Sequence, residues 1–244
     1  GHIAPGAMAS AIRASDKLIG WAMPESVRQQ AREGAANLEK MAINRPRQIN
    51  RRSKKIVRKT KETQIELELN LDGCGKISVN TPLGFFNHLL ELFAFHGGFN
   101  LNVKAEGDTF VDDHHLVEDV GIALGQALNS ILGDRSGISR YGFFVMPMDE
   151  VLARVAIDIG GRSYLDYNVE ITREKIGELS TECIKEFFMG FVRESKIALH
   201  IDILKTGNSH HIAEAVFKCF GRVLKMAVLP IDGNIPSTKG IIGE

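Results

Sequence analysis

Asp113-His114-His115-Leu116-Val117-Glu118 and Ser209-His210-His211-Ile212-Ala213-Glu214 are nearly identical stretches of this chain and hold four of its eight histidines. The repeat extends beyond them at a constant offset of 96 residues, because His114, His115, Glu118, Gly125 and Leu128 recur as His210, His211, Glu214, Gly221 and Leu224. Upstream, Leu101 and Val103 match Leu199 and Ile201 at an offset of 98, which a two-residue difference in loop length explains. The sequence therefore predicts a duplicated fold.

The elements expected around the two motifs follow the same order in both halves. In the first half, alternating apolar residues predict a strand over 63–71, a turn over 72–75 and a strand over 76–80 that pairs back as a hairpin. Helix 85–95, strand 101–105 and helix 117–132 follow, and the last is apolar on most sides and hence buried. The second half repeats this with strand 151–159, helix 181–193, strand 198–204 and helix 212–228. This order predicts an α+β fold of two tandem half-domains, 53–140 and 141–240, each a mixed sheet with helices packed on one face.

The composition bounds the class of protein. The chain has 244 residues, of which 44% are hydrophobic and 25% charged, which is typical of a soluble globular protein. No apolar run reaches the roughly 18 residues of a membrane-spanning helix, so we expect no membrane partner. The three cysteines form no CxxC pair, which predicts buried, reduced thiols and a cytoplasmic location.

The N-terminal region, residues 1–52, differs from the rest and is expected to be a basic extension. Residues 1–60 hold 13 Lys and Arg against 4 Asp and Glu, whereas the remainder holds 17 against 26. A basic arm can attract nucleic acid, but no interleaved aromatic residues support base stacking, so a solvated extension without a nucleic-acid partner is favoured. Its first ten residues resemble a cloning scar, a helix is expected from Pro24, and 51–55 is expected to be a linker. A plastid transit peptide is the alternative, and three acidic residues count against it: Glu25, Glu33 and Glu39.

The doubled motif has the chemistry of a metal site. Residues three and four apart share one face of a helix, so Glu118 can join His114 or His115 at one ion. The two adjacent histidines point about 100° apart and therefore reach different ions more easily. Nitrogen and oxygen ligands without thiolate suit Mn, Fe, Co, Ni or Zn. For a single motif, the alternative is that the adjacent histidines cap the helix or pack in the core. The presence of a second motif favours metal binding.

Further candidates lie outside the motifs. His88 is a further metal ligand, and an offset of 98 makes Glu186 its partner in the second half, with a solvated carboxylate as the alternative reading. His96 lies at a helix end, where a C-cap role is equally consistent. Cations that could hold a phosphate are scattered, and each alone is also consistent with a surface charge. They are Arg140, Arg162 and Lys218, together with Ser237 and Lys239 of the tail. A GxxxxGK[ST] loop is absent from the sequence, which argues against a P-loop nucleotide enzyme.

Between residues 54 and 240 the chain resembles imidazoleglycerol-phosphate dehydratase, a family of histidine biosynthesis. The resemblance is carried by the two metal motifs and by further segments of this sequence. These are Arg58-Lys59-Thr60-Lys61-Glu62-Thr63, Leu71-Asp72-Gly73-Cys74-Gly75, Phe86-Asn87-His88, His96-Gly97, Pro147-Met148-Asp149-Glu150, Phe217-Lys218 and Ser237-Thr238-Lys239-Gly240.

The resemblance implies the reaction and its residues. The family removes water from imidazoleglycerol phosphate to give imidazole acetol phosphate, and its metal ions act as Lewis acids at the substrate's imidazole. Two Mn ions per site are implied, in sites between the subunits of a closed homo-oligomer of about 24 subunits. The implied metal ligands are His88, His114, His115, Glu118, Glu186, His210, His211 and Glu214. Glu62 is implied as the proton-transfer residue, with His88 and His96 in the catalytic set. The implied phosphate clamp consists of Arg140, Arg162, Lys218, Ser237 and Lys239.

Two positions depart from the family pattern. The family often has His where Glu186 stands, and it usually has Asp where Asn87 stands beside His88. That Asp would orient the imidazole, so Asn87 is expected to do so as a neutral partner. Two other functions remain open on the residues alone. One is a di-metal hydrolase that releases phosphate, and the other is a metal-binding storage or structural particle.

Overall fold

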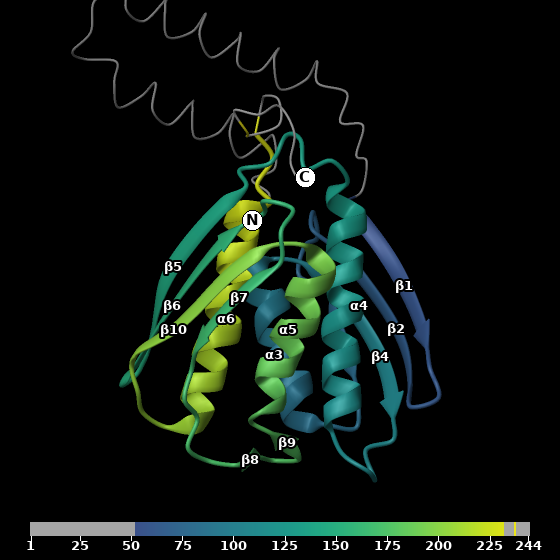
Figure 1. The fold of residues 1–244 in the computed structure, drawn as a ribbon, viewed down its shortest axis with the longest axis vertical. Coiled ribbons are helices and arrows are strands. Elements are labelled where there is room, and N and C mark those ends of the chain that lie inside the picture. The colour runs from purple at the N-terminus through teal and green to yellow at the C-terminus, as the bar shows by residue number, and fades with distance from the viewer. Residues whose placement is uncertain (1–51, 232–236, 238–244) are drawn as a thin grey trace, which may run out of the picture. The chain divides into compact units, whose positions relative to one another are not determined.

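The structure, a computed structural model, describes residues 52–231 and residue 237. The tag-like first ten residues, the helix expected from Pro24 and the tail residue Lys239 lie outside the described residues. In the described part the chain forms two four-stranded sheets with helices between them (Figure 1).

Each sheet is built from one half of the chain, and the two sheets have the same strand arrangement. The first has the order β1 (Ser53–Lys59), β2 (Thr63–Asn70), β4 (Asn100–Gly107), β3 (Ile77–Asn80). The second has the order β5 (Tyr141–Met148), β6 (Val151–Asp158), β10 (Ala198–Lys205), β7 (Tyr164–Asn168). In both, the first three strands are antiparallel and the fourth joins in parallel. The predicted duplication of the fold is confirmed.

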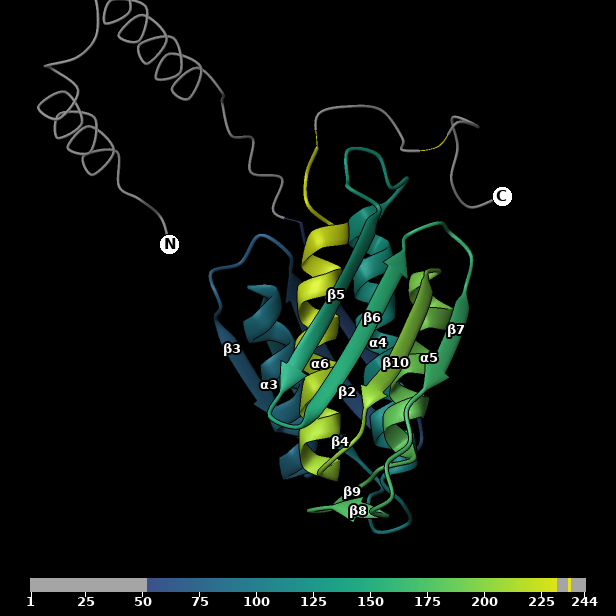
Figure 2. The ribbon, with the colours of Figure 1, turned by 90° about the vertical axis from the view of Figure 1, so that its left-hand side faces the viewer.

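Four helices fill the layer between the sheets, as the two perpendicular views show (Figures 1 and 2). They are α3 (Gly84–Gly97), α4 (His114–Leu132), α5 (Cys183–Ser195) and α6 (Ser209–Ala227). A short ribbon of β8 (Lys175–Ile176) and β9 (Leu179–Ser180) precedes α5. Each sheet thus has helices on one face and is open on the other, as predicted. Within residues 52–231, none of the helices has the length and apolarity to cross a membrane.

The burial pattern explains this arrangement. Ile65, Leu67 and Leu69 alternate along β2 and are fully buried on the face that meets α4, while the residues between them face outward. Helix α4 is buried on most sides because it packs on its own sheet and also on α5. Phenylalanine side chains from α3, α5 and α6 meet in the centre, for example Phe93 against Phe220 at 4.9 Å between ring centroids. The core therefore lies in the helix layer, where the two halves meet.

The helices pair across the halves. Helix α4 of the first half packs along α5 of the second, and α6 of the second half packs along α3 of the first. Close approach is possible because a glycine lies at each crossing: a Cβ on Gly125 would collide with the carbonyl of Phe191, and one on Gly221 with the carbonyl of Phe93. The glycines are related by the 96-residue offset and the phenylalanines by 98. The two crossings are therefore copies of one another.

Two predictions of local structure are wrong. Residues 76–80 do not form a hairpin with the preceding strand, because β4 lies between β2 and β3 and pairs in parallel with β3. The turn before β3 is fixed instead by Asn100, whose Oδ1 accepts the backbone N–H groups of Cys74 and Lys76. The expected linker 51–55 is wrong from Ser53 onward, because this segment begins β1. Both of its lysines are exposed, and Lys55 pairs with Glu66 on the outer face of the sheet at 2.7 Å.

Candidate metal centre and active site

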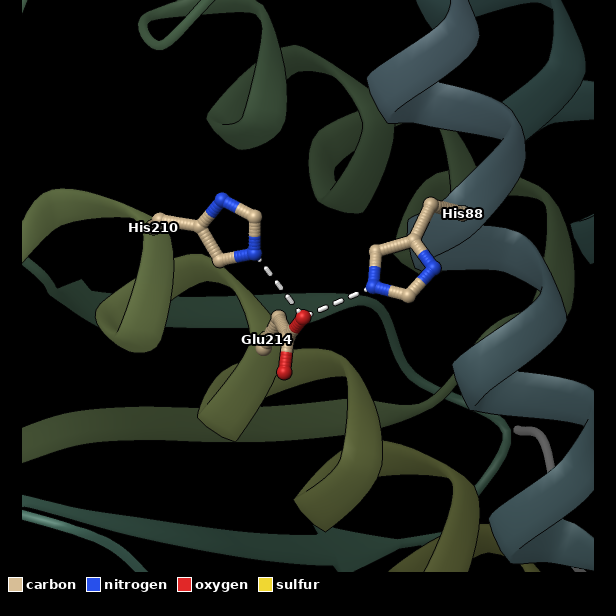
Figure 3. Close-up of side chains that lie close together, drawn as sticks. All are labelled: His88, His210 and Glu214. Atoms are coloured by element: carbon tan, nitrogen blue, oxygen red, sulfur yellow. Dashed lines mark hydrogen bonds and ion pairs between the residues drawn. The ribbon is translucent and has the colours of Figure 1, made fainter.

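The second motif and His88 form one cluster of ligand atoms (Figure 3). Glu214 Oε1 lies 2.7 Å from His88 Nε2 and 2.9 Å from His210 Nε2. His210 and Glu214 share a face of α6 because they are four residues apart, and His88 reaches them from α3. The cross-half pairing of α3 with α6 thus brings His88 to the second motif rather than to the first.

The Glu214 carboxylate is the centre of this cluster. Burial would raise its pKa, but hydrogen bonds from Lys218, His88 and His210 outweigh burial and lower the pKa to about 2. Lys218 Nζ holds the second carboxylate oxygen at 2.6 Å. Glu214 is therefore ionised at neutral pH and presents Oε1 to the two imidazoles.

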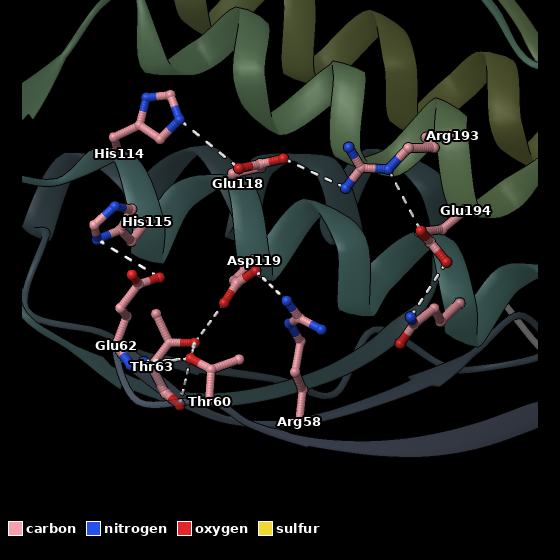
Figure 4. A network of polar contacts seen from close by, with 11 residues as sticks. Arg58, Thr60, Glu62, Thr63, His114, His115, Glu118, Asp119, Arg193 and Glu194 are labelled. Atoms are coloured by element: carbon pink, nitrogen blue, oxygen red, sulfur yellow. Dashed lines mark hydrogen bonds and ion pairs between the residues drawn. The ribbon is translucent and has the colours of Figure 1, made fainter.

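At the first motif, the adjacent histidines reach different partners; Figure 4 draws the contact of His114 with Glu118 and the longer one of His115 with Glu62. His114 Nε2 lies 3.7 Å from Glu118, while His115 Nδ1 lies 3.2 Å from both carboxylate oxygens of Asp108. The two rings stand at 86° to each other. The hydrogen bond that His115 donates to Asp108 raises the pKa of His115 against the opposing effect of burial. Because Asp108 binds Nδ1, the Nε2 atom of His115 is left for a metal or substrate.

The second motif has an equivalent arrangement around His211. Its Nδ1 lies 3.1 Å from Glu150, in the turn between β5 and β6, and its ring stands at 89° to that of His210. Glu150 also accepts the backbone N–H of Asn208, the residue that caps α6. The backbone N–H of Asn208, that of Glu150 itself and the imidazole of His211 together lower the Glu150 pKa to about 2. Each motif thus has one histidine oriented by a carboxylate from outside it.

The two orienting carboxylates do not occupy equivalent positions. Strands β2 and β6 are related by an offset of 88, which makes Glu150 the counterpart of Glu62. Strands β4 and β10 are related by 98, which makes Thr206 the counterpart of Asp108. In the first half Asp108 takes the imidazole, and the Glu62 carboxylate lies 4.0 Å from His115 Nδ1, too far for a hydrogen bond. Glu62 therefore lies at the first motif without the histidine hydrogen bond that its counterpart Glu150 makes with His211.

Several predicted residues have other surroundings. Glu186 lies in the first turn of α5, half-buried, and the clusters of ligand atoms found among the described residues do not contain it. Burial, Lys218 and Arg222 lower the pKa of His96 in the last turn of α3. Asn87 does not orient His88: its side chain bonds the backbone of Thr81 instead, and this expectation is wrong.

Asp112, Asp113 and Cys183 also lie close enough together to hold a metal ion, but their contacts serve the fold. The Asp113 carboxylate accepts the backbone N–H and the hydroxyl of Ser180, at 2.5 and 2.8 Å, which ties the start of α4 to β9. Burial raises the pKa of the Cys183 thiol to about 12, and a neutral thiol is a poor metal ligand.

Among the described residues, the cations of the predicted phosphate clamp do not come together within one chain. Lys218 lies at the metal cluster, but Arg140 donates its backbone N–H to Ala227, the last residue of α6. A helix rises about 1.5 Å per residue, so Arg140 lies about 25 Å from His210 at the other end of α6. Arg162 is exposed after β6, and the Arg140 guanidinium binds Asp158 at 2.7 Å. Ser237 is described, while Lys239 is not.

The donor set fits a divalent transition metal. Imidazole nitrogens and a carboxylate oxygen are ligands of Mn, Fe or Zn. Metal–ligand bonds of about 2.0–2.2 Å put neighbouring ligand atoms about 3 Å apart. Glu214 Oε1 lies at such distances from Nε2 of His88 and Nε2 of His210, at 2.7 and 2.9 Å. Among the described clusters, none combines residues of both motifs.

Residues that orient the ligands were not assigned a role from the sequence. Glu150 could have been found, because the offset of 88 that relates Leu67 to Val155 also relates Glu62 to Glu150. Asp108 carries no such signal, because its counterpart is Thr206.

Comparison with known proteins agrees with this site. The imidazoleglycerol-phosphate dehydratase family profile matches residues 81–224. An imidazoleglycerol-phosphate dehydratase of Caldicellulosiruptor saccharolyticus is 48% identical over 194 residues, covering 80% of this chain and 100% of that protein. One of Exiguobacterium sp. is 51% identical over 192 residues, covering 78% of this chain and 98% of that protein.

Solved structures agree as well. The dehydratase structure from Staphylococcus aureus has a TM-score of 0.66 and 40% identity, covering 73% of this chain and 99% of that one. The Pyrococcus furiosus enzyme, solved in complex with (S)-C348, has a TM-score of 0.67 and 35% identity, covering 77% of this chain and 100% of that one. On sequence, fold and site together, the chain belongs to the imidazoleglycerol-phosphate dehydratase family of hydro-lyases.

Proposed function

We propose that this chain converts imidazoleglycerol phosphate to imidazole acetol phosphate and water, a step of histidine biosynthesis. The observation that carries the proposal is the cluster of His88, His210 and Glu214, in which the two halves of the chain supply ligands for one ion. Two Mn ions per site are the proposed cofactors, and the cytoplasm is the proposed location. The proposed ligands are His88 with the histidines and glutamates of both motifs, and Glu186 is proposed as a further ligand.

The metal ions, when bound, supply Lewis-acid chemistry at the imidazole and at the departing hydroxyl. The chain's own residues supply position and proton transfer. Asp108 and Glu150 bind Nδ1 of His115 and His211 and leave each Nε2 facing the site. Glu62, whose carboxylate is free of an imidazole hydrogen bond, transfers the proton at the substrate carbon. His96 is proposed to support the catalytic set from the end of α3.

The phosphate clamp is proposed to form between subunits. Arg140 and Arg162 lie at the far end of the molecule from the Lys218 cation and the metal cluster, so a second copy brings them to the site. Ser237 and Lys239 of the tail complete the clamp. We therefore propose a closed homo-oligomer, for which the resemblance to the family implies about 24 subunits with cubic symmetry. Removal of metal with a chelator should dissociate the particle, and an unchanged mass by light scattering would contradict metal-bridged assembly.

Turnover of imidazoleglycerol phosphate by the purified, Mn-loaded protein tests the function. Wild type should form imidazole acetol phosphate, and His115→Ala should lose both activity and part of the bound Mn. His200→Ala is the matched control, because His200 lies on the exposed face of β10 beside Asp166 and should leave both unchanged. Release of inorganic phosphate would indicate a hydrolase instead. Mn binding without any turnover would indicate a storage or structural particle.

A further inference from the structure

Behind the first metal motif, Arg58, Thr63 and Asp119 form a polar triad (Figure 4). Asp119 follows Glu118 on α4 and is only 7% exposed. Its carboxylate accepts one hydrogen bond from Arg58 Nη2 at 2.7 Å and another from Thr63 Oγ1 at 2.5 Å. The triad therefore joins the motif helix to the ends of β1 and β2, on either side of the turn that carries Glu62.

The turn itself is tightly closed. Thr60 Oγ1 accepts the backbone N–H groups of Glu62 and Thr63 at 3.1 and 2.9 Å. The two threonine hydroxyls lie 3.2 Å apart, and Thr60 N–H donates to the Thr63 carbonyl. Fixing Thr63 therefore also fixes the backbone of Glu62, its neighbour.

The second half of the chain shows what the fold requires at this place. Under the offsets of 88 and 96, the triad positions Arg58, Thr63 and Asp119 correspond to Met146, Val151 and Ala215. Strand register confirms the correspondence, because Arg58 pairs with Ile65 as Met146 pairs with Ala153. The three apolar residues are 9%, 1% and 0% exposed. The same architecture thus accommodates an apolar trio where the first half has an ion pair.

Stability does not explain the polar version. In this pair the Asp119 side chain is buried and the Arg58 side chain is 30% exposed. Replacing an ion pair with a buried member by well-packed apolar residues is often neutral or stabilising. Among the described residues, the buried Arg58 Nε has no hydrogen-bond partner, which is a further cost of the triad. The triad must therefore have another role.

The difference between the two turns indicates that role. Glu150 is held by its own carboxylate, which binds His211 and the backbone N–H of Asn208. Glu62 has its carboxylate 4.0 Å from His115, outside hydrogen-bond distance. The Glu62 carboxylate must exchange a proton, so it cannot also hold its turn in place by a fixed hydrogen bond. The turn is held instead by the triad of Arg58, Thr63 and Asp119.

We propose that Asp119, acting through Thr63 and Arg58, is a positioning residue that holds the Glu62 turn against the motif helix for proton transfer. The proposal rests on the dehydratase function proposed above. Asp119 does not touch the substrate in this role. Its removal should lower the rate of the chemical step and leave substrate affinity and metal binding unchanged.

The second half supplies the test variant. Arg58→Met/Thr63→Val/Asp119→Ala transplants the apolar trio and should fold with a Tm equal to or above that of wild type. It should bind Mn and assemble as wild type does, with KM unchanged and kcat lowered on the order of 10- to 100-fold, the usual effect of a small misplacement of a catalytic group. Thr63→Val should lower kcat in the same way, while Thr63→Ser, which keeps the hydroxyl, should restore it. Lys55→Gln/Glu66→Gln, an ion pair on the outer face of the same two strands, is the matched control and should have no effect.

Wild-type kcat in the triple variant would overturn the proposal, and so would a joint loss of Mn binding, assembly and activity, which would make the triad structural. Should the triple variant fail to fold, the kcat values of Thr63→Val and Thr63→Ser are compared instead. Wild-type kcat in Thr63→Val, or an equal loss of kcat in both variants, would overturn the proposal. Failure of the proposed function is distinct, because wild type itself would then be inactive.

Discussion

The Nε2 atom of His88 lies 2.7 Å from the carboxylate of Glu214, although the two residues belong to different halves and are 126 positions apart. Helix pairing across the halves produces this contact, since α3 carries His88 to the N-terminal turns of α6. A metal ion bound here would link the two halves of the chain. Bound metal should therefore also stabilise the fold.

Glu150 should control metal binding at the second motif without being a ligand itself. We expect Glu150→Gln to lower Mn affinity by roughly 10- to 100-fold, because His211 then loses the carboxylate that fixes its ring and tautomer. Isothermal titration of the metal-free protein with Mn measures this directly. Asp166→Asn provides the control, because Asp166 makes the same kind of contact with His200 at 3.4 Å on the exposed sheet face. Equal affinity in wild type and Glu150→Gln would contradict the orienting role.

The Asp108–His115 pair predicts a pH dependence of the metal-free protein. Its hydrogen bond raises the His115 pKa, so the imidazole keeps its proton to a higher pH than in the unfolded chain. A raised histidine pKa stabilises the fold below about pH 6.5, and this contribution is lost as the pH rises through the folded-state pKa. Asp108→Asn should lower the His115 pKa and flatten this part of the stability profile. An NMR titration of the histidine resonances, with thermal unfolding between pH 5 and 8, would show both; an unshifted His115 resonance would count against the pair.

The two helix crossings should be intolerant of a single methyl group. Gly125→Ala and Gly221→Ala place a Cβ against the carbonyls of Phe191 and Phe93, which overpacks the contact. We expect each to lower the free energy of unfolding by about 1–3 kcal/mol. Gly84→Ala is the matched control: it lies at the start of α3, where a Cβ would meet nothing closer than Glu178 Oε2 at 3.8 Å, and should be neutral or slightly stabilising. Calorimetry of the three variants measures the difference in Tm. If Gly125→Ala and Gly221→Ala had the same Tm as Gly84→Ala, the helices would be able to move apart without cost.

The cysteines should divide into one reactive and two unreactive thiols. Cys74 is exposed, so the prediction of a buried thiol is wrong for this residue. Cys183 and Cys219 are buried as predicted, and burial raises the pKa of each of these thiols to about 12. Since the thiolate is the reacting form, a thiol reagent at neutral pH should titrate one group in the native protein and three after unfolding. Cys74→Ser should remove the fast phase entirely. Reaction of all three in the native state would show that the core opens readily.

Much of the fold could be predicted from residues whose pattern is local. The alternation of Ile65, Leu67 and Leu69 and the apolar helix 117–132 identify their elements because burial imposes the period directly. The parallel pairing of β3 with β4 could not be predicted from its turn, because α3 intervenes and strand neighbours are set by the packing of that helix. Strand β1 was assigned to a linker because its exposed lysines conceal its alternation.

In the site, too, the local motifs could be predicted from the sequence, whereas the contacts between distant helices could not. Repeat counting found both motifs, and His88 was proposed because it lies on the helix that precedes the first motif. It could not show that His88 joins the second motif, because that depends on which helices cross. Glu186, the counterpart of His88, therefore remains a proposed ligand on α5, the helix that packs along α4.

The exchange of helices between the halves also bears on how such a chain could arise. Either half alone would expose the face of α3 or α4 that its counterpart covers, and it would hold an incomplete ligand set. Two identical half-length chains, however, could cover each other's helices and complete each other's ligands with the same crossings. We infer that a duplicated chain of this kind is the fused form of an ancestral homodimer, joined in the loop before β5. Separately produced fragments cut in that loop should accordingly recombine into one native fold.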